Sequence, residues 1–119
     1  MDNKKTISQL KEVVKNFCEE REWDQYHNAK DLAIGIITES SELLEYFRFK
    51  SAEEVEEAIA HRKGGISEEL ADILFFILRF AQHYDIDLSS EFEKKIRKNA
   101  NKYPIEKAKG SNKKYTEYE

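Results

Sequence analysis

The segment SEELADILFFILRFAQHY, residues 67–84, is the strongest indication of the fold of this chain. Its apolar residues recur at the spacing of an α-helix, and Ser67 stands where a helix N-cap is expected. At about 100° per residue they cover an arc of roughly 200°, about twice the width that a surface helix of a monomer needs. The residues of this arc are Leu70, Ile73, Leu74, Phe76, Ile77, Leu78, Phe80, Ala81 and Tyr84. We therefore expect the helix to be central in its domain or to be buried by another subunit. For so short a chain this favours a homodimer or homotetramer.

On both sides of this helix the sequence predicts further helices and no strands. Asn28 is expected to cap one of them, and Ser51 with Glu54 has the spacing of a capping box. Gly64-Gly65 is predicted to be a turn, and Pro104 to stop the last helix. The helices are expected at about residues 6–22, 28–49, 51–62, 67–84 and 89–102. The predicted fold class is an all-α, compact bundle of four to five helices, completed by oligomerisation.

The composition limits what kind of protein this can be. A chain of 119 residues suffices for one domain, which we place at residues 1–104, with a lysine-rich, irregular tail at 105–119. Twenty Lys and Arg against 24 Asp and Glu give a net charge of −4, which argues against a general nucleic-acid binder. The longest apolar run, Ile73–Leu78, is far shorter than the roughly 20 residues of a membrane span. The single Cys18 cannot form an internal disulfide. We expect a soluble, cytoplasmic protein with neither nucleic-acid nor membrane partners.

Two pairs of acidic residues, Glu39 with Glu42 and Glu69 with Asp72, have the i, i+3 spacing that places both members on one side of a helix. The spacing alone proves little, because 24 acids in 119 residues should give about five such pairs by chance. Glu39 and Glu69, however, fall inside the apolar arcs of their helices, where an ionised carboxylate is costly unless it is compensated. Divalent cations with a preference for oxygen ligands would compensate these acids, and so would lysine or arginine partners. A di-iron carboxylate bundle is excluded, because no histidine of the chain follows a glutamate by three residues.

These acids also carry a resemblance to a known family. The segments ESSE at 39–42 and ELAD at 69–72, with a spacer of 26 residues, resemble the ExxE…ExxD signature of the MazG-like superfamily of all-α nucleoside triphosphate pyrophosphohydrolases. Their surroundings are similar to the dCTP pyrophosphatase branch of that superfamily. The similar stretches are REWDQYH at 21–27, YFRFKS at 46–51, KKIRKNANKYP at 94–104 and EKAKG at 106–110. The resemblance covers nearly the whole chain from about residue 7.

The resemblance implies a metal-dependent enzyme. Mg²⁺, or alternatively Mn²⁺, would be held by Glu39, Glu42, Glu69 and Asp72, which are also the implied catalytic residues. Cleavage would fall between the α- and β-phosphates of a nucleoside triphosphate and give a monophosphate and pyrophosphate. Such an activity serves nucleotide-pool house-cleaning, the removal of excess or modified nucleotides.

Other matched positions would bind the substrate. Lys95 is expected to meet a phosphate, and Asn99, one helical turn later, to bond the sugar or the base. Tyr103 follows after another turn. Trp23 and His27, in the loop before the second helix, would stack on the base and hydrogen-bond to it.

The chain departs from the branch at two rings. Phe49 stands where the branch has a tryptophan and Phe76 where it has a tyrosine, so a ring is kept at each position while a hydrogen-bonding group is lost. These changes bear on base choice more than on the chemistry, because pockets discriminate strongly by hydrogen bonds. The branch resemblance alone favours dCTP or a modified cytosine nucleotide. Gly35, one turn before Glu39, is expected to permit close packing of two helices.

Two further functions stay open on the sequence. The chain would be a helical protein-interaction module if its acids formed salt bridges across a bundle and its aromatic residues formed a partner groove. It would also fit a relative that acts on a phosphoribosyl-nucleotide in histidine synthesis, although the loop with Trp23 speaks against that. Stabilisation of the fold by Mg²⁺ and a non-hydrolysable nucleotide would favour the enzyme, because a ligand that binds only the folded state stabilises it.

Overall fold

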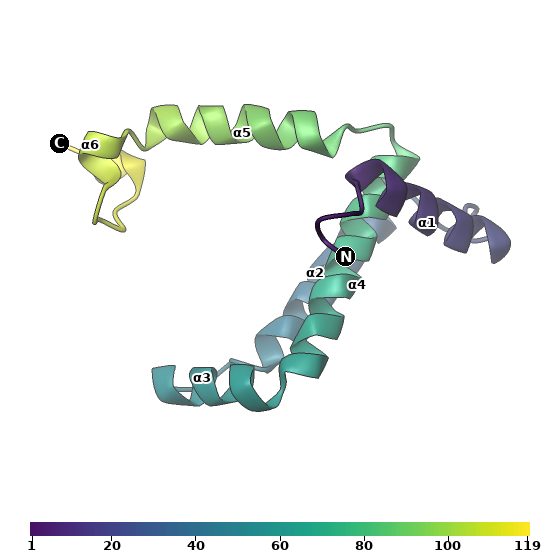
Figure 1. Ribbon diagram of the computed structural model, residues 1–119, viewed down its shortest axis with the longest axis horizontal. Coiled ribbons are helices and arrows are strands. Elements are labelled where there is room, and N and C mark those ends of the chain that lie inside the picture. Colours follow the sequence, from purple (N-terminus) through teal and green to yellow (C-terminus); the bar gives the residue numbers. More distant parts are fainter. The chain divides into compact units, whose positions relative to one another are not determined.

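The computed structural model describes residues 1–119, and all of its regular elements are helices (Figure 1). The prediction of an all-α fold is confirmed. The elements are α1 (Ile7–Glu20), α2 (Ala29–Glu45), α3 (Ala52–His61), α4 (Lys63–His83), α5 (Leu88–Lys102), α6 (Ile105–Ala108) and the 3₁₀ helix η1 (Tyr115–Glu117). They form two units, residues 1–86 with α1–α4 and residues 87–119 with α5, α6 and η1. None of the helices combines the length and the hydropathy that a membrane crossing requires.

The predicted caps begin the helices of the first unit. Asn28 accepts a hydrogen bond from the backbone N–H of Asp31 at 2.9 Å and so caps α2. Ser51 and Glu54 form the predicted capping box at α3, because each side chain accepts from the other residue's backbone N–H, at 3.2 and 3.0 Å. These bonds satisfy N–H groups that the first turn of a helix otherwise leaves free.

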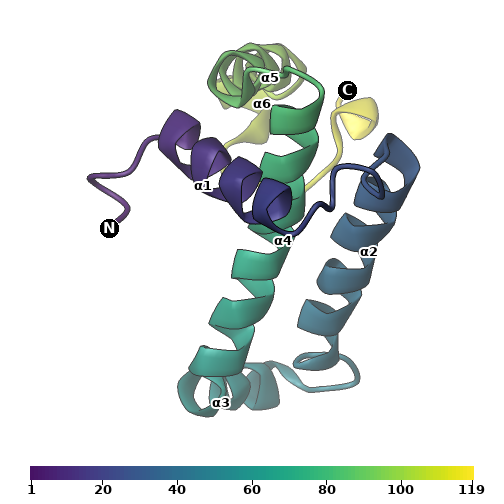
Figure 2. The ribbon, with the colours of Figure 1, turned by 90° about the vertical axis from the view of Figure 1, so that its right-hand side faces the viewer.

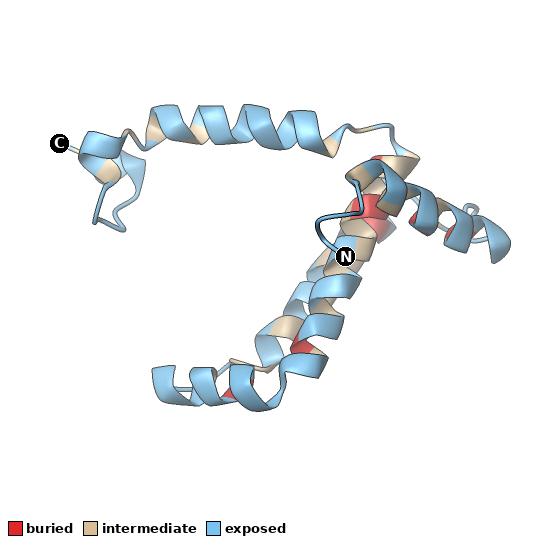
Figure 3. Ribbon diagram, viewed as in Figure 1, coloured by how far each residue is buried: buried red, intermediate tan, exposed pale blue.

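Packing in the first unit is centred on α4. Helices α2 and α4 lie side by side and antiparallel, with α3 connecting them at one end, and α1 crosses the C-terminal half of α4 (Figure 2). Buried side chains come from these helices, whereas α5 contributes none (Figure 3). The buried apolar residues are Val14, Cys18, Leu32, Ala58, Ile66, Leu78 and Ala81. The apolar arc of α4 is thus only partly covered, and completion of the bundle by oligomerisation stays a prediction.

The predicted turn at Gly64-Gly65 is wrong. Helix α4 begins at Lys63, so both glycines lie in its first turn, and Ser67 lies inside the helix instead of capping it. The chain changes direction at Arg62, whose φ of −122° and ψ of 21° leave the helical region. Gly65 is used for packing, because a Cβ there would collide with the hydroxyl of Tyr46. The packing of Tyr46 thus explains why a glycine stands at residue 65, a position that local sequence rules assign to a turn.

Two further boundaries differ from the prediction. Helix α2 ends at Glu45, and residues 46–49 form turns that finish at Phe49 with a φ of 64°. The left-handed backbone conformation of Phe49 separates these turns from Ser51, whose backbone is extended and which caps α3. The tail at 105–119 is not irregular throughout, because it contains α6 and η1. The predicted domain boundary after residue 104 stays a prediction.

Candidate functional site

Two contacts between α2 and α4 fix how these helices face each other. At one end the ring of Phe76 lies on Gly35, and at the other the ring of Tyr46 lies on Gly65. A Cβ at Gly35 would come within 2.5 Å of Phe76 Cε1, so the helix backbone approaches the ring as closely as a glycine allows. The expectation that Gly35 permits close packing is confirmed. Between the two contacts lie both acidic pairs, one on each helix.

The structure brings the carboxylates of Glu39, Glu69 and Asp72 together. Each offers one oxygen, and these three oxygens lie within 4.8 Å of one another. The Oε2 atoms of Glu39 and Glu69 are buried and have no hydrogen-bond partner. An ionised oxygen without a partner is costly to bury, so this donor set suits a cation that is added to the protein.

No lysine or arginine of the chain forms an ion pair with any of the four acids. The salt bridges of the structure lie elsewhere. Compensation by basic side chains of the same chain, the alternative that the sequence left open, is therefore wrong. The four acids lie close together, and no basic side chain of the protein neutralises their charge.

This concentration of charge changes the protonation of the site. Hydrogen bonding with the Glu42 side chain and burial together raise the pKa of Glu39 to about 7. Burial, with the nearby Glu42 and Asp72 carboxylates, also raises the pKa of Glu69. Like charges close together disfavour ionisation, and a bound cation would reverse that effect. Glu42 is exposed and takes part in the cluster through its contact with Glu39.

Trp23 and His27 lie in the loop between α1 and α2. Trp23 is 38% exposed and packs edge-on against Phe17, with 5.6 Å between the ring centroids. The centroid of its ring also lies 6.1 Å from that of the His27 ring, with 60° between the two ring planes. The side of the indole that stays open suits a flat ligand such as a nucleobase.

Arg79 of α4, whose side chain bonds Asp24 and His27 of this loop, was not singled out from the sequence. Arg79 is buried among the apolar residues of α4 and pairs with Asp24 of the loop. It also donates hydrogen bonds to His27 Nδ1 at 2.8 Å and to Gln82 Oε1 at 2.6 Å. The helical pattern gave no sign of its burial, because at about 100° per residue Arg79 falls outside the apolar arc, and only its being the sole Lys or Arg of the stretch 67–82 sets it apart. A buried charge of this kind requires partners, and Asp24 is the acid that the loop provides.

Phe49 and Phe76, the two rings that differ from the dCTP pyrophosphatase branch, have different surroundings. Phe76 faces α2 at Gly35 and packs edge-on with Phe75, with their centroids 5.5 Å apart. Phe49 is 91% exposed, and the Arg48 guanidinium lies over its ring at 4.6 Å from the centroid. Phe76 is thus part of the interface between α2 and α4, whereas Phe49 is an exposed ring that contacts the neighbouring Arg48.

The three remaining candidates belong to the second unit, which is described by itself. Lys95 is exposed on α5, and Asn99 on the same helix is half-buried. Tyr103 ends α5 and makes edge-on contacts with Tyr115 and Tyr118, with centroid distances of 5.8 and 6.0 Å. Tyr103 therefore anchors the C-terminal segment of its own unit through packing.

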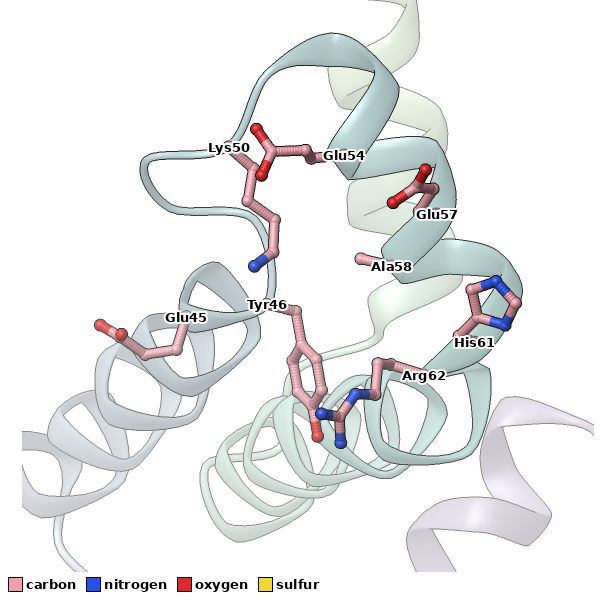
Figure 4. Close-up of a pocket in the computed structure, with 8 residues that line it drawn as sticks. All are labelled: Glu45, Tyr46, Lys50, Glu54, Glu57, Ala58, His61 and Arg62. Carbon is pink, nitrogen blue, oxygen red and sulfur yellow. The ribbon is translucent and has the colours of Figure 1, made fainter.

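A separate cavity of about 430 Å³ lies where α2, α3 and α4 meet (Figure 4). None of the four clustered acids lines it. Lys50 and Tyr46 reach into it from the α2–α3 connection, opposite Ala58 of α3 (Figure 4). Its lining residues are Glu45, Tyr46, Lys50, Glu54, Glu57, Ala58, His61 and Arg62. The mixture of acids and bases selects no single charge of ligand.

Comparisons with known proteins agree on one family. The MazG-like family matches residues 34–118 of the chain. dCTP pyrophosphatase 1 of Rattus norvegicus is 31% identical over 114 residues, which cover 94% of this chain and 67% of the rat protein. The corresponding protein of Bos taurus is 32% identical over 114 residues, which cover 94% of this chain and 68% of the bovine protein. The crystal structure of a pyrophosphatase from Archaeoglobus fulgidus superposes with a TM-score of 0.78 at 36% identity, covering 82% of this chain and 91% of the archaeal one.

Proposed function

This chain belongs to the MazG-like family, and from that premise we propose that it hydrolyses (deoxy)nucleoside triphosphates to monophosphates and pyrophosphate with Mg²⁺. It is a nucleoside triphosphate pyrophosphohydrolase, and the relatives with printed activities are pyrophosphatases. The observation that carries the metal dependence is the trio of carboxylate oxygens within 4.8 Å, on Glu39, Glu69 and Asp72. We assign to it a house-cleaning role in the cytoplasmic nucleotide pool.

The residues at this site fit a divalent cation with a preference for oxygen. Two buried oxygens, of Glu39 and Glu69, lack any partner in the protein, and every donor of the cluster is a carboxylate oxygen. Mg²⁺ prefers such ligands and usually keeps several waters, which suits a site that is open at Asp72. Mn²⁺ fits the same donor set. We assign Glu39, Glu42, Glu69 and Asp72 as its ligands.

The metal supplies neutralisation of phosphate charge and a water of lowered pKa when it is bound. The protein's own groups fix where this happens. Glu39 and Glu69 lie on helices that are in close contact at both ends of the site, where the ring of Phe76 lies on Gly35 and the ring of Tyr46 lies on Gly65. Without a cation the four acids would repel a triphosphate, so substrate binding and metal binding are coupled.

Substrate contacts are assigned to two groups of residues. In the first unit Trp23, His27, Phe49 and Phe76 are the candidates for the base, and in the second unit Lys95, Asn99 and Tyr103 are those for the phosphates and the sugar or base. The names of the mammalian relatives, together with the motifs at residues 21–27 and 94–104, favour dCTP or a modified cytosine nucleotide.

We further propose that the enzyme is a homodimer or homotetramer. Helix α2 carries three large apolar residues that are half exposed or more, Ile34, Ile37 and Leu44, at a spacing that forms a stripe on one side. Helix α4 adds Leu70 and Leu74. A second copy of the chain, which carries the same stripes, is the occupant that suits them.

A product-resolved assay tests the reaction. A panel of deoxynucleoside triphosphates is incubated with the protein and Mg²⁺, and products are separated by ion exchange with a parallel assay for pyrophosphate. Monophosphate and pyrophosphate should appear in equal amounts. The Glu69→Gln variant controls for contaminating phosphatases and should be inactive. Release of orthophosphate with accumulation of diphosphate, or no turnover with either Mg²⁺ or Mn²⁺, would refute the proposal.

A further inference from the structure

Arg79 is 1% exposed, and each nitrogen of its guanidinium group has a different partner. Nε donates to His27 Nδ1 at 2.8 Å, one terminal nitrogen donates to Gln82 Oε1 at 2.6 Å, and the other pairs with Asp24 Oδ1. The metal cluster uses none of these residues. The group therefore needs an explanation beyond metal binding.

The chemistry of the guanidinium group fixes the state of His27. Arginine has donors only and keeps its proton at any accessible pH, so the Nε–H must donate and His27 Nδ1 must accept. An imidazole whose Nδ1 accepts is neutral and carries its proton on Nε2. The protein provides no hydrogen-bond partner for Nε2. That N–H is left as a donor, on a ring whose centroid lies 6.1 Å from that of Trp23.

The net effect of the surroundings on the pKa of His27 also favours the neutral ring. Burial, the Arg79 guanidinium and His83, both on α4, lower the pKa of His27, and Asp24 and Asp31 oppose this more weakly. The Arg79 charge itself is compensated by Asp24. The surface around Trp23 and His27 thus presents a neutral donor, which suits an uncharged base edge better than a phosphate.

We propose that Arg79 is a positioning residue for the nucleobase, which fixes His27 as a neutral ring with its proton on Nε2. It simultaneously ties the loop 21–28 to α4 through Asp24. In the bound nucleotide Nε2–H then donates to a carbonyl oxygen or a ring nitrogen of the base. This contact rests on the proposed function, since it assumes that the loop meets the base, whereas the state of the ring does not depend on it.

Nitrogen-15 NMR of the imidazole rings tests the ring state in the wild-type protein. His27 should show a protonated Nε2 and an unprotonated Nδ1 from pH 6 to 8, and the spectrum of the His27→Gln variant assigns its signals among the three histidines. A protonated Nδ1, or a charged ring at pH 7, overturns the proposal. This measurement needs no turnover, so it stands apart from a failure of the proposed function.

A matched pair of variants at His27 tests the role of the donor with Arg79 and its bonds to Asp24 and Gln82 left in place. The amide nitrogen of Gln reaches the place of Nε2, whereas that of Asn reaches only the place of Nδ1. His27→Gln should keep KM within about threefold of the wild type, and His27→Asn should raise it about tenfold, the scale of one lost hydrogen bond. Equal KM values for the two variants overturn the proposal.

Arg79→Lys tests the positioning itself. Lysine keeps the charge but cannot bond His27, Asp24 and Gln82 together. KM should rise about tenfold with kcat within about twofold, and KM should become dependent on pH between 6 and 7.5 because His27 is no longer held neutral. Arg62→Lys, which is exposed and outside both sites, is the control that should leave both constants unchanged. A loss of kcat without a change in KM overturns the positioning role, and the pair at His27 decides the question if Arg79→Lys does not fold.

Discussion

The backbone of Gly35 on α2 lies against the ring of Phe76 on α4, so closely that a Cβ at Gly35 would sit 2.5 Å from Cε1 of the ring. One turn further along α2 is Glu39, and one turn back along α4 is Asp72. Because the helices are antiparallel, the contact at Gly35 sets the distance between α2 and α4 at the place where their carboxylates meet.

Replacing Gly35 with alanine should therefore disturb both stability and activity. The added Cβ would overlap the ring of Phe76, which also packs edge-on against Phe75, so the free energy of unfolding should fall by about 1–3 kcal/mol, the usual range for overpacking. Urea denaturation and a turnover assay measure the two effects. Gly64→Ala is the matched control, because a Cβ there meets nothing within 4 Å, and it should stabilise α4 by up to about 1 kcal/mol. Equal effects of the two variants would contradict this account.

Replacing Glu39 or Glu69 with glutamine should abolish turnover without unfolding the protein. The amide keeps the shape of the side chain and removes a charge that no basic residue compensates, so the Tm of the metal-free protein should rise. The rise in Tm that Mg²⁺ gives the wild type should disappear in both variants. Differential scanning calorimetry with and without Mg²⁺ measures this. Glu45→Gln, on the exposed side of α2, serves as the control and should behave like the wild type. Turnover that persists in both variants would remove the metal assignment.

The stability of the metal-free protein should depend on pH through Glu39. The folded-state pKa of this carboxyl is about 7, above its ordinary value of 4.5, so between these values the folded chain binds more protons than the unfolded chain. The resulting stability is fully present below pH 4.5 and is lost as pH rises through 7. The Tm should thus fall between pH 5 and 8 in a chelator, and the fall should be smaller with saturating Mg²⁺. At pH 7 metal binding should release protons from this residue, measurable by titration calorimetry in two buffers. A Tm that rises over this range in the chelator contradicts the prediction.

Replacing Trp23 with alanine should weaken nucleotide binding by roughly 1–3 kcal/mol, visible mostly in KM, if the indole stacks on the base. The variant also loses the edge contact with Phe17, so its Tm should fall. Trp23→Phe separates the two effects, because it keeps a ring for stacking, and its KM should stay closer to that of the wild type. An unchanged KM in the alanine variant would exclude the indole as a base platform.

Replacing Ile37 with glutamate should break the predicted oligomer. The side chain is 70% exposed in the single chain, so a charge there costs little in the monomer but a great deal inside an interface. Sedimentation velocity should show an oligomer for the wild type and for Ile37→Val, and a species of 14.1 kDa for Ile37→Glu. A wild-type protein that sediments as a monomer at micromolar concentration would refute the interface on α2.

Much of the local structure could be predicted from the sequence alone. Helical periodicity, the cap at Asn28 and the box at Ser51 depend on residues three or four apart, so they are readable without any tertiary contact. The same local geometry showed that Glu39 and Glu69 face the interior, which is why the acids could be singled out among many.

How the helices meet depends on tertiary contacts and could not be predicted from the sequence. The pairing of Phe76 with Gly35, and of Tyr46 with Gly65, joins residues far apart in the chain, and periodicity contains no information on which positions of two helices come into register. Helix α4 begins at Lys63 despite the preference of two glycines for a turn, and the second of these contacts places Gly65 against Tyr46. The burial of Arg79 likewise depends on tertiary structure, because its partners Asp24 and His27 lie more than fifty residues away in the chain. Burial of an arginine becomes favourable only once the fold brings such partners to it.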